Sequence, residues 1–305
     1  MSKIGIVTVT YNGVTVLQDF VRCLKEQTCQ DYILYVIDNF SSDDSANEIE
    51  RLCVENKIPF QLIRNDKNLG VARANNQGIR MALADNCDPV IIANNDIEFY
   101  PDTLASVNEY ARTRPTDMIL PKVVFHDQPD LVWCAGGKIS ALRGVPRTAG
   151  YRQKDGAAFA EPKYVTSAPT CFLVVPAEVF KSVGLMDEDY FVYLDDSDFV
   201  VRAANSGYRI YYTPGPVIRH KVSISTGGAD SPFTIHQISK NTILFLYKNN
   251  PPVLAAWYIF VALIRNMLHL RRYNAIQRNK LFQGLGDGLR FIFDKSAARH
   301  NIPRV

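Results

Sequence analysis

The chain has 305 residues, of which 47% are hydrophobic and 21% are charged. This composition excludes intrinsic disorder, and the length allows one large domain or two modest ones. The formal net charge of +3 is too small to indicate a nucleic-acid partner. The charge is unevenly placed, however, because residues 265–305 hold nine Lys/Arg and only Asp287 and Asp294 as acids.

The six cysteines are scattered and form no C-x-x-C pair: Cys23, Cys29, Cys53, Cys87, Cys134 and Cys171. This pattern is typical of reduced, buried thiols in a cytosolic protein rather than of a disulfide framework or a zinc site. Strand-like sequence begins at Lys3, and we recognise no export signal before it. We therefore expect a cytoplasmic protein.

The first half of the chain alternates strand-like and helix-like segments. Short apolar runs predict strands at 4–9, 32–37, 60–63 and 90–93. Helical spacing and capping signals predict helices around 17–24, from Ser41 or Ser42 to 56, over 71–84, and from Pro101 onward. This β-α-β-α order predicts an α/β fold with a mostly parallel sheet, right-handed crossovers and helices on both faces.

The alternation ends after a predicted strand at 118–125, where the Gly- and Pro-rich segment 126–165 predicts loops and short antiparallel strands. Further along we expect strands at 171–175 and 208–212, helices from 176 and over 196–206, and helices from 231 with a break at Pro251-Pro252. We expect residues 1–125 and 126–230 to be two halves of one α/β domain. Residues 231–305 would form a C-terminal helical segment.

The most informative stretch is the strand at 90–93, which runs directly into Asn94-Asn95-Asp96-Ile97-Glu98. An apolar run of this kind is typical of a strand buried on both faces, and ligands of open α/β sheets bind beyond the carboxyl ends of such strands. Amide and carboxylate oxygens suit Mg²⁺ or Mn²⁺ and, through the metal, phosphates. A polar loop in which Asp96 caps a turn is equally consistent with these residues alone.

Three glycine-rich phosphate loops are absent: G-x-G-x-x-G after the first strand, G-x-x-x-x-G-K, and the opening loop of sugar nucleotidyltransferases. Hydride transfer, ATP hydrolysis and nucleotidyl transfer are therefore disfavoured. Where the first strand ends, Tyr11 could stack on a nucleobase. Asp38, at the end of the second strand, could accept from an imide or a ribose hydroxyl. In the alternative, Tyr11 packs against protein and Asp38 caps the next helix.

A second acidic cluster, Asp195-Asp196-Ser197-Asp198, follows the aromatic-rich segment 190–194. Acids at a helix N-terminus are stabilised by about 0.3–1 kcal/mol each, but capping does not require three acids within four residues. Aromatic neighbours that desolvate an acid raise its pKa, which makes a carboxylate here a candidate general base. His220 gains a role only if the fold brings it near Asp96.

Six segments, taken in order, resemble successive motifs of the family 2 glycosyltransferases, and the nearest branch is the rhamnosyltransferase-like enzymes of bacterial surface polysaccharide synthesis. They are Thr8-Val9-Thr10-Tyr11-Asn12, residues 36–43, residues 68–76, Asn94-Asn95-Asp96, residues 193–199 and residues 220–225. The resemblance covers most of residues 1–250. It implies a GT-A (Rossmann-like) fold and an inverting transfer of a sugar from a nucleotide diphosphate to a glycan or lipid-linked glycan.

The resemblance also implies roles for individual residues. Asp96 and His220 take the positions of ligands to a divalent cation, Mn²⁺ or Mg²⁺, and Asp196 takes that of the catalytic base. The donor-binding positions are Thr8, Thr10, Tyr11, Asn12, Asp38, Asn68, Arg73, Asn94 and Asn95. The acceptor-binding positions, which are less firmly marked, are Trp133, Gly137, Thr170 and Asp195. Because the amides at 94 and 95 depart from a strict D-x-D, Glu98 is a substitute ligand if the strand continues.

The donor sugar that we favour is rhamnose from dTDP-rhamnose, with a UDP-hexose or UDP-galactofuranose as alternatives. A protein that binds nucleotide sugars without catalysis, as a regulatory or scaffold subunit, is the alternative from another class. Loss of Asp96 or Asp196 would mark such a subunit, and the sequence keeps both.

The C-terminal segment has a twelve-residue apolar run at 253–264, which is too short for a membrane span. Four basic residues follow it: Arg265, His269, Arg271 and Arg272. This resembles an interfacial helix with basic anchors and favours an anionic membrane surface as partner. The alternative is a helix packed on the catalytic domain, or a homo-oligomer contact, with a solvated basic face.

Overall fold

The computed structural model describes residues 3–222, 228 and 230–300, apart from the side chains of residues 269 and 295–300. Two sequence expectations therefore lie outside the described part: the Ser223-Ile224-Ser225 end of the last motif, and the side chain of His269 as a basic anchor. The chain divides into two compact units. We call them the sheet unit (Met1–Lys138, Arg147–Phe191 and Asp195–Ser225) and the helical unit (Ile139–Pro146, Val192–Leu194 and Thr226–Val305).

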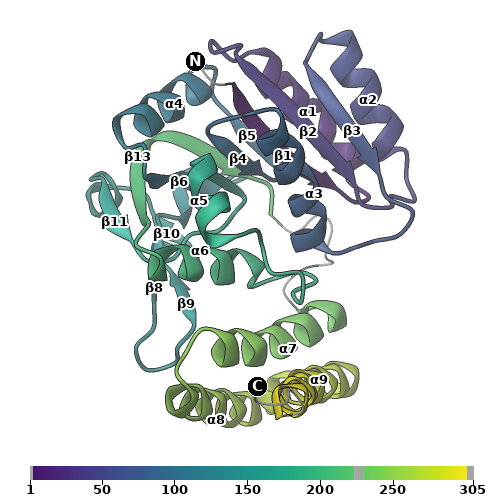
Figure 1. The fold of residues 1–305 in the computed structure, drawn as a ribbon, viewed down its shortest axis with the longest axis vertical. Coiled ribbons are helices and arrows are strands. Elements are labelled where there is room, and N and C mark those ends of the chain that lie inside the picture. The colour runs from purple at the N-terminus through teal and green to yellow at the C-terminus, as the bar shows by residue number, and fades with distance from the viewer. Residues whose placement is uncertain (1–2, 223–227, 229, 301–305) are drawn as a thin grey trace. The chain divides into compact units, whose positions relative to one another are not determined.

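The N-terminal part of the sheet unit is the parallel β-α array that the sequence predicts (Figure 1). Four parallel strands lie in the order β4-β1-β2-β3. Their bounds are Ile4–Thr10 (β1), Tyr32–Asp38 (β2), Phe60–Arg64 (β3) and Val90–Ala93 (β4). The crossover helices are Val14–Lys25 (α1), Ser45–Glu55 (α2) and Val71–Ala84 (α3). Because parallel strands point the same way, the residues after β1, β2 and β4 meet at one edge of the sheet.

Helix α2 begins later than the Ser41 or Ser42 that we expected, and the reason is local. The Ser45 hydroxyl accepts a hydrogen bond from the backbone N–H of Gly13. The Ser41 hydroxyl accepts a hydrogen bond from the backbone N–H of Asn12, the residue before Gly13. These serines therefore bind the loop after β1 instead of capping the helix, and residues 42–44 between them form bends and a turn.

The remaining strands of the chain run in mixed directions, and all but β8 and β9 extend the same sheet. They are Ile97–Phe99 (β5), Asp117–Phe125 (β6), Leu131–Cys134 (β7), Gly137–Ile139 (β8), Pro146–Thr148 (β9), Gln153–Lys154 (β10), Lys163–Val165 (β11), Phe172–Val175 (β12) and Arg209–His220 (β13). The accompanying helices are Thr103–Thr113 (α4), Ala177–Val183 (α5) and Asp195–Asn205 (α6). Strand β12 runs antiparallel between β4 and β6, and β13 pairs with β5 and β6. Strands β8 and β9 form a separate two-stranded sheet.

Strand β13 is longer than the predicted strand at 208–212. It continues through Pro214-Gly215-Pro216, where its register against β6 shifts between Thr213 and Val217, and it ends at His220. Proline and glycine usually mark the end of a strand, but an irregularity in the pairing accommodates them here. His220 is therefore fixed by strand pairing opposite Ile97.

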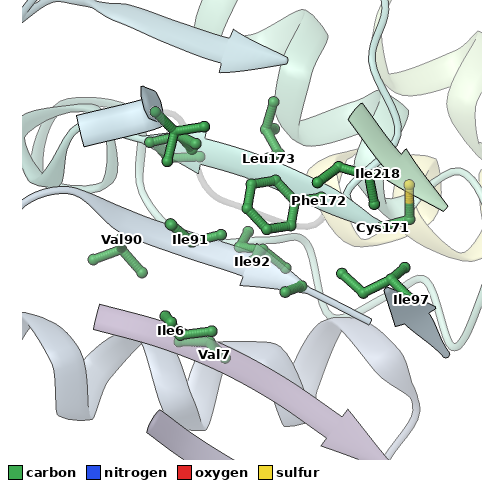
Figure 2. Close-up of a cluster of buried hydrophobic side chains, with 14 of the residues drawn as sticks. Ile6, Val7, Val90, Ile91, Ile92, Ile97, Cys171, Phe172, Leu173 and Ile218 are labelled. Carbon is green, nitrogen blue, oxygen red and sulfur yellow. The ribbon is translucent and has the colours of Figure 1, made fainter. Parts of the chain in front are cut away.

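The core of the sheet unit explains why β4 ends where it does. Figure 2 shows Ile91 and Ile92 of β4 packed among Phe172, Leu173 and Ile218 from β12 and β13. All four residues of β4 are buried, which confirms a strand covered on both faces. A strand held this firmly gives the polar residues after it a defined position.

Gly70, just before α3, lies where the backbone approaches the segment before α6. Its φ of 82° and ψ of 167° are a conformation that glycine adopts almost alone. A Cβ at this position would lie 2.5 Å from the carbonyl oxygen of Phe191, which accepts a hydrogen bond from Val71. Gly70 is therefore required both by its own conformation and by the contact.

We expect Gly70→Ala to destabilise the protein by more than the matched substitution Gly184→Ala. Gly184 has nearly the same backbone conformation, but its Cβ would meet no atom within 4 Å. Conformational strain of about 1–3 kcal/mol applies to both variants, and the clash with Phe191 applies to one. Urea unfolding of the two variants measures the difference, and equal losses of stability would contradict the role of the contact.

The helical unit consists mainly of three helices: Pro232–Lys248 (α7), Pro252–His269 (α8) and Ala275–His300 (α9). Figure 1 shows α7 lying across α8 and α9. Ile235 and Ile243 of α7 form a small core with Leu281 and Leu285 of α9. The break between α7 and α8 falls at Pro251, as the sequence predicts.

The helical unit also includes the short loop Val192–Leu194, which leads directly into α6. Tyr193 and Leu194 both have positive φ angles, 70° and 65°. The left-handed conformation costs a non-glycine residue about 1–2 kcal/mol. The buried amide of Asn241, on α7, donates to the carbonyl oxygens of Val192 and Tyr193 at 2.8 and 3.0 Å. These hydrogen bonds help to hold the strained loop.

Candidate functional site

Buried polar atoms without partners gather where β1, β2 and β4 end. The hydroxyls of Thr8 and Thr10, Oδ1 of Asp38 and Nδ2 of Asn95 have no hydrogen-bond partner among the described residues. Thr10 lies opposite Asp38 in the strand register, and a Cβ added to Gly13 would lie 3.3 Å from both Thr10 Oγ1 and Asn95 Nδ2. Burying polar groups unpaired is costly. The cluster therefore fits a site that a polar ligand completes.

The structure gives several other expected donor-site residues protein partners. Asn12 Oδ1 accepts from the backbone N–H of Ser42 at 2.7 Å. Asn68 Oδ1 accepts from the backbone of Gly70 and from Asn39. Arg73 donates through Nε to Glu188 at 2.7 Å, and Tyr11 lies partly exposed at the strand end. Asn12 and Asn68 thus shape the loops around the pocket. The roles of Arg73 and Tyr11 stay predictions.

Asn39 was not singled out by the sequence reasoning, although it follows Asp38 directly. Its side chain donates to Asn68 and accepts from the backbone N–H of Leu69 and from Asn65. It therefore ties the end of β2 to the loop before α3. The only signal in the sequence was its place inside the 36–43 motif.

The two expected metal ligands lie side by side. His220 Nε2 is 3.1 Å from Asp96 Oδ1, and the backbone N–H of Lys221 donates to the carbonyl oxygen of Asp96. Both side chains are nearly buried, and the Trp133 ring meets the His220 ring edge-on with centroids 4.6 Å apart. His220 Nδ1 has no partner in the described part of the chain. The condition for a role of His220, that the fold bring it near Asp96, is therefore met, and its role as a metal ligand stays a prediction.

This pair has the donor chemistry for a divalent cation. Burial raises the pKa of the Asp96 carboxyl, but hydrogen bonds from His220 and Asn94 outweigh it and hold the pKa below the ordinary 3.8. An ionised carboxylate suits Mn²⁺ or Mg²⁺, and imidazole is a common ligand of transition metals. The described residues contain no group of three or more His, Cys, Asp or Glu side chains that could hold a metal. Any cation here would therefore take its other ligands from water and a bound diphosphate.

Asn94 has a physical reason to be an amide. Its side chain hydrogen-bonds the Asp96 carboxylate, and its backbone N–H donates to the carbonyl oxygen of Cys171 at 2.9 Å. A carboxylate at position 94 would repel Asp96. Asn95, the next residue, presents the unpaired Nδ2 described above. The two amides therefore differ in role: Asn94 supports the Asp96 carboxylate, and Asn95 adds an unpaired donor to the polar cluster at the strand ends.

Glu98, the substitute ligand expected from the strand period, has basic partners. Its carboxylate lies 3.0 Å from Lys221 Nζ and from His126 Nε2, and 3.2 Å from Arg22. Burial raises the pKa of Glu98, but Lys221 outweighs it and the pKa lies below its ordinary value. This arrangement favours an ion-pair role that ties β5 to the end of β13.

The acidic cluster at the start of α6 separates into three roles. Asp198 is buried and pairs with Arg202 at 2.7 Å, so its charge is neutralised within the protein. Asp196 accepts from its neighbour Ser197 through the backbone N–H at 2.6 Å, and from the backbone of Thr170. Burial raises the pKa of Asp196. Burial and the adjacent Asp196 charge raise the pKa of Asp195 from 3.8 to about 8.

Because Asp195 holds its proton in the folded protein, we expect stability to fall as the pH rises from about 4 to 8. In that window the unfolded chain has lost a proton that the folded chain keeps, so raising the pH favours unfolding. Asp195→Asn has no such proton and should show a flatter profile. Urea melts of both proteins at pH 5, 6.5 and 8 test this. A stability difference that does not change with pH would contradict it.

The Asp96–His220 pair and the Asp195–Asp196 pair both neighbour Thr170 and Cys171, just before β12. The Cys171 carbonyl accepts from Asn94, and Thr170 hydrogen-bonds Asp196. The buried Cys171 thiol has a pKa raised by burial and by the charges of Cys134, Asp96 and Asp196, so it lies near both acids. Sequence reasoning named Thr170 but missed Cys171, whose apolar surroundings resembled ordinary core.

Gly137, an expected acceptor-site residue, has a structural reason to be glycine. A Cβ there would lie 2.5 Å from the carbonyl oxygen of Arg147. Its contact with an acceptor stays a prediction, as do those of Trp133 and Asp195. The Trp133 ring contacts the His220 ring edge-on and therefore lies beside the Asp96–His220 pair.

The α/β sheet carries unpaired buried polar atoms at its carboxyl edge, beside a carboxylate–imidazole pair and a buried acid pair. This arrangement agrees with the GT-A glycosyltransferase fold that the sequence motifs imply. The model of glycosyl transferase family 2 matches residues 5–173, and the chain belongs to this family. It is therefore a glycosyltransferase.

The chain is similar to two rhamnosyltransferases over most of its length. The dTDP-rhamnosyl transferase RfbF of Shigella flexneri is 25% identical and aligns with 92% of this chain and 91% of its own. The N-acetylglucosaminyl-diphospho-decaprenol L-rhamnosyltransferase of Mycobacterium tuberculosis is 26% identical over 79% of this chain and 83% of its own.

Solved structures share the fold. Mannosyltransferase PcManGT from Pyrobaculum calidifontis, in complex with GDP-Man and Mn²⁺, has a TM-score of 0.59 at 15% identity, covering 94% of this chain and 87% of that one. This chain spans about half, 49%, of the solved S. aureus TarS chain, with a TM-score of 0.60 at 16% identity. At these identities the likeness shows the fold alone.

Proposed function

We propose that this glycosyltransferase is an inverting, metal-dependent enzyme that moves rhamnose from dTDP-rhamnose to a glycan or lipid-linked glycan. The observation that carries the proposal is the Asp96–His220 pair. On one side of it lie the unpaired polar atoms at the strand ends. On the other side, hydrogen bonds from Asn94 to Cys171 and from Thr170 to Asp196 connect its surroundings with the candidate base. The choice of rhamnose is supported by the two rhamnosyltransferase relatives. A UDP-hexose or UDP-galactofuranose is the alternative donor.

In this mechanism Asp196 removes the proton of the acceptor hydroxyl as that oxygen attacks the anomeric carbon opposite the nucleotide. The raised pKa of Asp196 makes it a better proton acceptor than an ordinary aspartate. Asp96 and His220 would hold Mn²⁺ or Mg²⁺, which supplies Lewis-acid stabilisation of the departing diphosphate. The leaving group needs no proton, so one base suffices.

The two halves of the sheet unit would divide the substrates between them. Residues 1–125 bind the donor, with Thr8, Thr10, Asp38 and Asn95 completing their hydrogen bonds on the nucleotide. Residues 126–230 bind the acceptor and hold the base. Asp195, protonated near neutral pH, can donate a hydrogen bond to an acceptor hydroxyl.

A panel of nucleotide sugars tests the proposal. Thermal shifts are measured with dTDP-rhamnose, UDP-galactofuranose, UDP-glucose and GDP-mannose, each with and without Mn²⁺. Nucleotide release is then followed with a polar lipid extract of bacterial membranes as acceptor. We expect the largest shift and the fastest release with dTDP-rhamnose and Mn²⁺. Donor binding without any release would support the non-catalytic subunit instead, and no binding would contradict the proposal.

For location, we propose a cytoplasmic enzyme that lies on the inner face of the membrane. The lipid-linked acceptor in the name of the mycobacterial relative supports this. A homo-oligomer contact through the C-terminal helices is the alternative use of the same segment.

A further inference from the structure

Helix α8 presents a continuous apolar stripe that no other described part of the chain covers. Its members share one face of the helix and are 44% to 84% exposed: Val253, Leu254, Trp257, Phe260, Ile264, Met267 and Leu268. Their spacing repeats every three or four residues over the whole helix, so the stripe does not break. Single exposed apolar residues are common, but a contiguous row of this length marks an interaction surface.

The opposite face of α8 is packed against protein. Ala255 and Ala262 are buried, and Ile259 and Leu263 pack on the core formed by α7 and α9. The expectation that this segment is too short for a membrane span was wrong by length and composition alone, because the helix Pro252–Arg272 is long and apolar enough to cross one, the one such segment among the described residues. A spanning helix would have to give up its packing on α7 and α9. The structure therefore favours a helix that lies in the plane of an interface with one face embedded.

The charge around the stripe selects the kind of interface. Helix α8 contains no Asp or Glu, and the exposed Arg271 and Arg272 follow it directly. Between residues 231 and 294 the sequence holds eight Lys/Arg against Asp287 and Asp294. Asp287 is itself paired with His236 at 2.9 Å and lies 3.6 Å from Arg290. An apolar stripe that ends in exposed arginines, within a segment of net positive charge, complements anionic lipid headgroups.

A second apolar anchor lies beside the helix. The loop Ile139–Pro146 belongs to the helical unit, where the Tyr258 hydroxyl donates to the Ala141 carbonyl at 2.8 Å. Gly144 packs so closely on the Tyr258 ring that a Cβ would lie 2.4 Å from it. These contacts hold the loop next to α8, and its Leu142 is 67% exposed.

We propose that the stripe of α8, with Leu142 and the basic turn at Arg271 and Arg272, docks this enzyme on an anionic lipid bilayer. The aromatic pair Trp257 and Phe260, with ring centroids 6.0 Å apart, enters the boundary between headgroups and acyl chains. The two arginines contact the headgroups. This docking surface deepens the proposed function, because it specifies how the enzyme would reach a lipid-linked acceptor. It rests on the proposed function only for that purpose, since the surface contains no residue of the donor site.

Vesicle co-sedimentation of the full chain tests the docking surface. Vesicles contain phosphatidylcholine alone or mixed with phosphatidylglycerol, at moderate salt. We expect binding to the anionic vesicles, and at least a tenfold loss of binding in Trp257→Glu/Phe260→Glu and in Arg271→Gln/Arg272→Gln. The matched control Val54→Glu changes an equally exposed apolar residue of α2 and should bind as the wild type does. Trp257 emission should shift to the blue on anionic vesicles and not on neutral ones.

Two outcomes would overturn the proposal. One is a wild-type protein that ignores anionic vesicles. The other is a stable oligomer in sedimentation velocity that Trp257→Glu/Phe260→Glu dissociates, which would assign the stripe to a second copy of this chain. Donor binding, followed by thermal shift, should be the same in all these variants. A failure of docking with donor binding intact is thereby distinguished from a failure of the proposed function.

Discussion

Asp196→Asn is expected to lower kcat by about 10²–10⁴-fold, the range that a general base contributes. The amide oxygen can still accept the backbone hydrogen bond from Ser197, which helps the start of α6 to keep its position. The amide cannot take a proton from the acceptor hydroxyl. Donor binding should not change, because no atom of the donor pocket is altered. Rates of nucleotide release and donor thermal shifts measure the two effects separately.

The matched control is Asp198→Asn, two residues along the same helix. Asp198 is neutralised by Arg202 and bonded to the Tyr190 hydroxyl, so we expect the variant to melt at a lower temperature. Its kcat at a temperature where it is fully folded should stay close to the wild type. Full turnover in Asp196→Asn would remove this residue from the role of base. An equal loss of kcat in both variants would point to disruption of the helix start.

The parallel half of the fold could be predicted from the sequence because its signals are local. Helix α3 has the bounds 71–84 that apolar spacing gave, and β4 has the bounds 90–93 of its apolar run. Strand β13 could not be delimited in the same way. Pro214-Gly215-Pro216 has no strand propensity of its own. The strand continues through it only because the β13 residues on both sides of it pair with β6.

The candidate site shows the same division. Asp96, Asp196 and His220 could be named because they stand in ordered segments that resemble motifs of the family, and their roles stay predictions. The roles of the neighbours could not be read from the sequence. Only tertiary contacts show that Lys221 neutralises Glu98, and that Asn94 supports Asp96. Glu98 and Lys221 lie far apart in the sequence, so no local sequence pattern shows that they form an ion pair.

Asp96→Asn is expected to weaken Mn²⁺-dependent binding of dTDP at least about 100-fold, since changes one shell further out already cost 10–100-fold. The variant removes the one carboxylate of the pair and leaves His220 as the other expected ligand. Binding of the nucleotide without metal should be preserved, because Thr8, Thr10 and Asp38 are unchanged. Calorimetric titration of dTDP, with Mn²⁺ and with a chelator, separates the two contributions.

Glu98→Gln decides whether the effect belongs to a ligand or to any acid near this strand. Glu98 follows Asp96 by two residues, the spacing that puts side chains on one side of a strand. Its carboxylate, however, is already held by Lys221, Arg22 and His126. Its loss should therefore lower stability and leave the Mn²⁺ dependence of dTDP binding intact. If Glu98→Gln reduced that dependence as much as Asp96→Asn, the metal site would extend along β5. If neither variant changed it, the Asp96–His220 pair would be a structural hydrogen bond, and the leaving diphosphate would need its stabilising charge from the basic side chains of the chain instead.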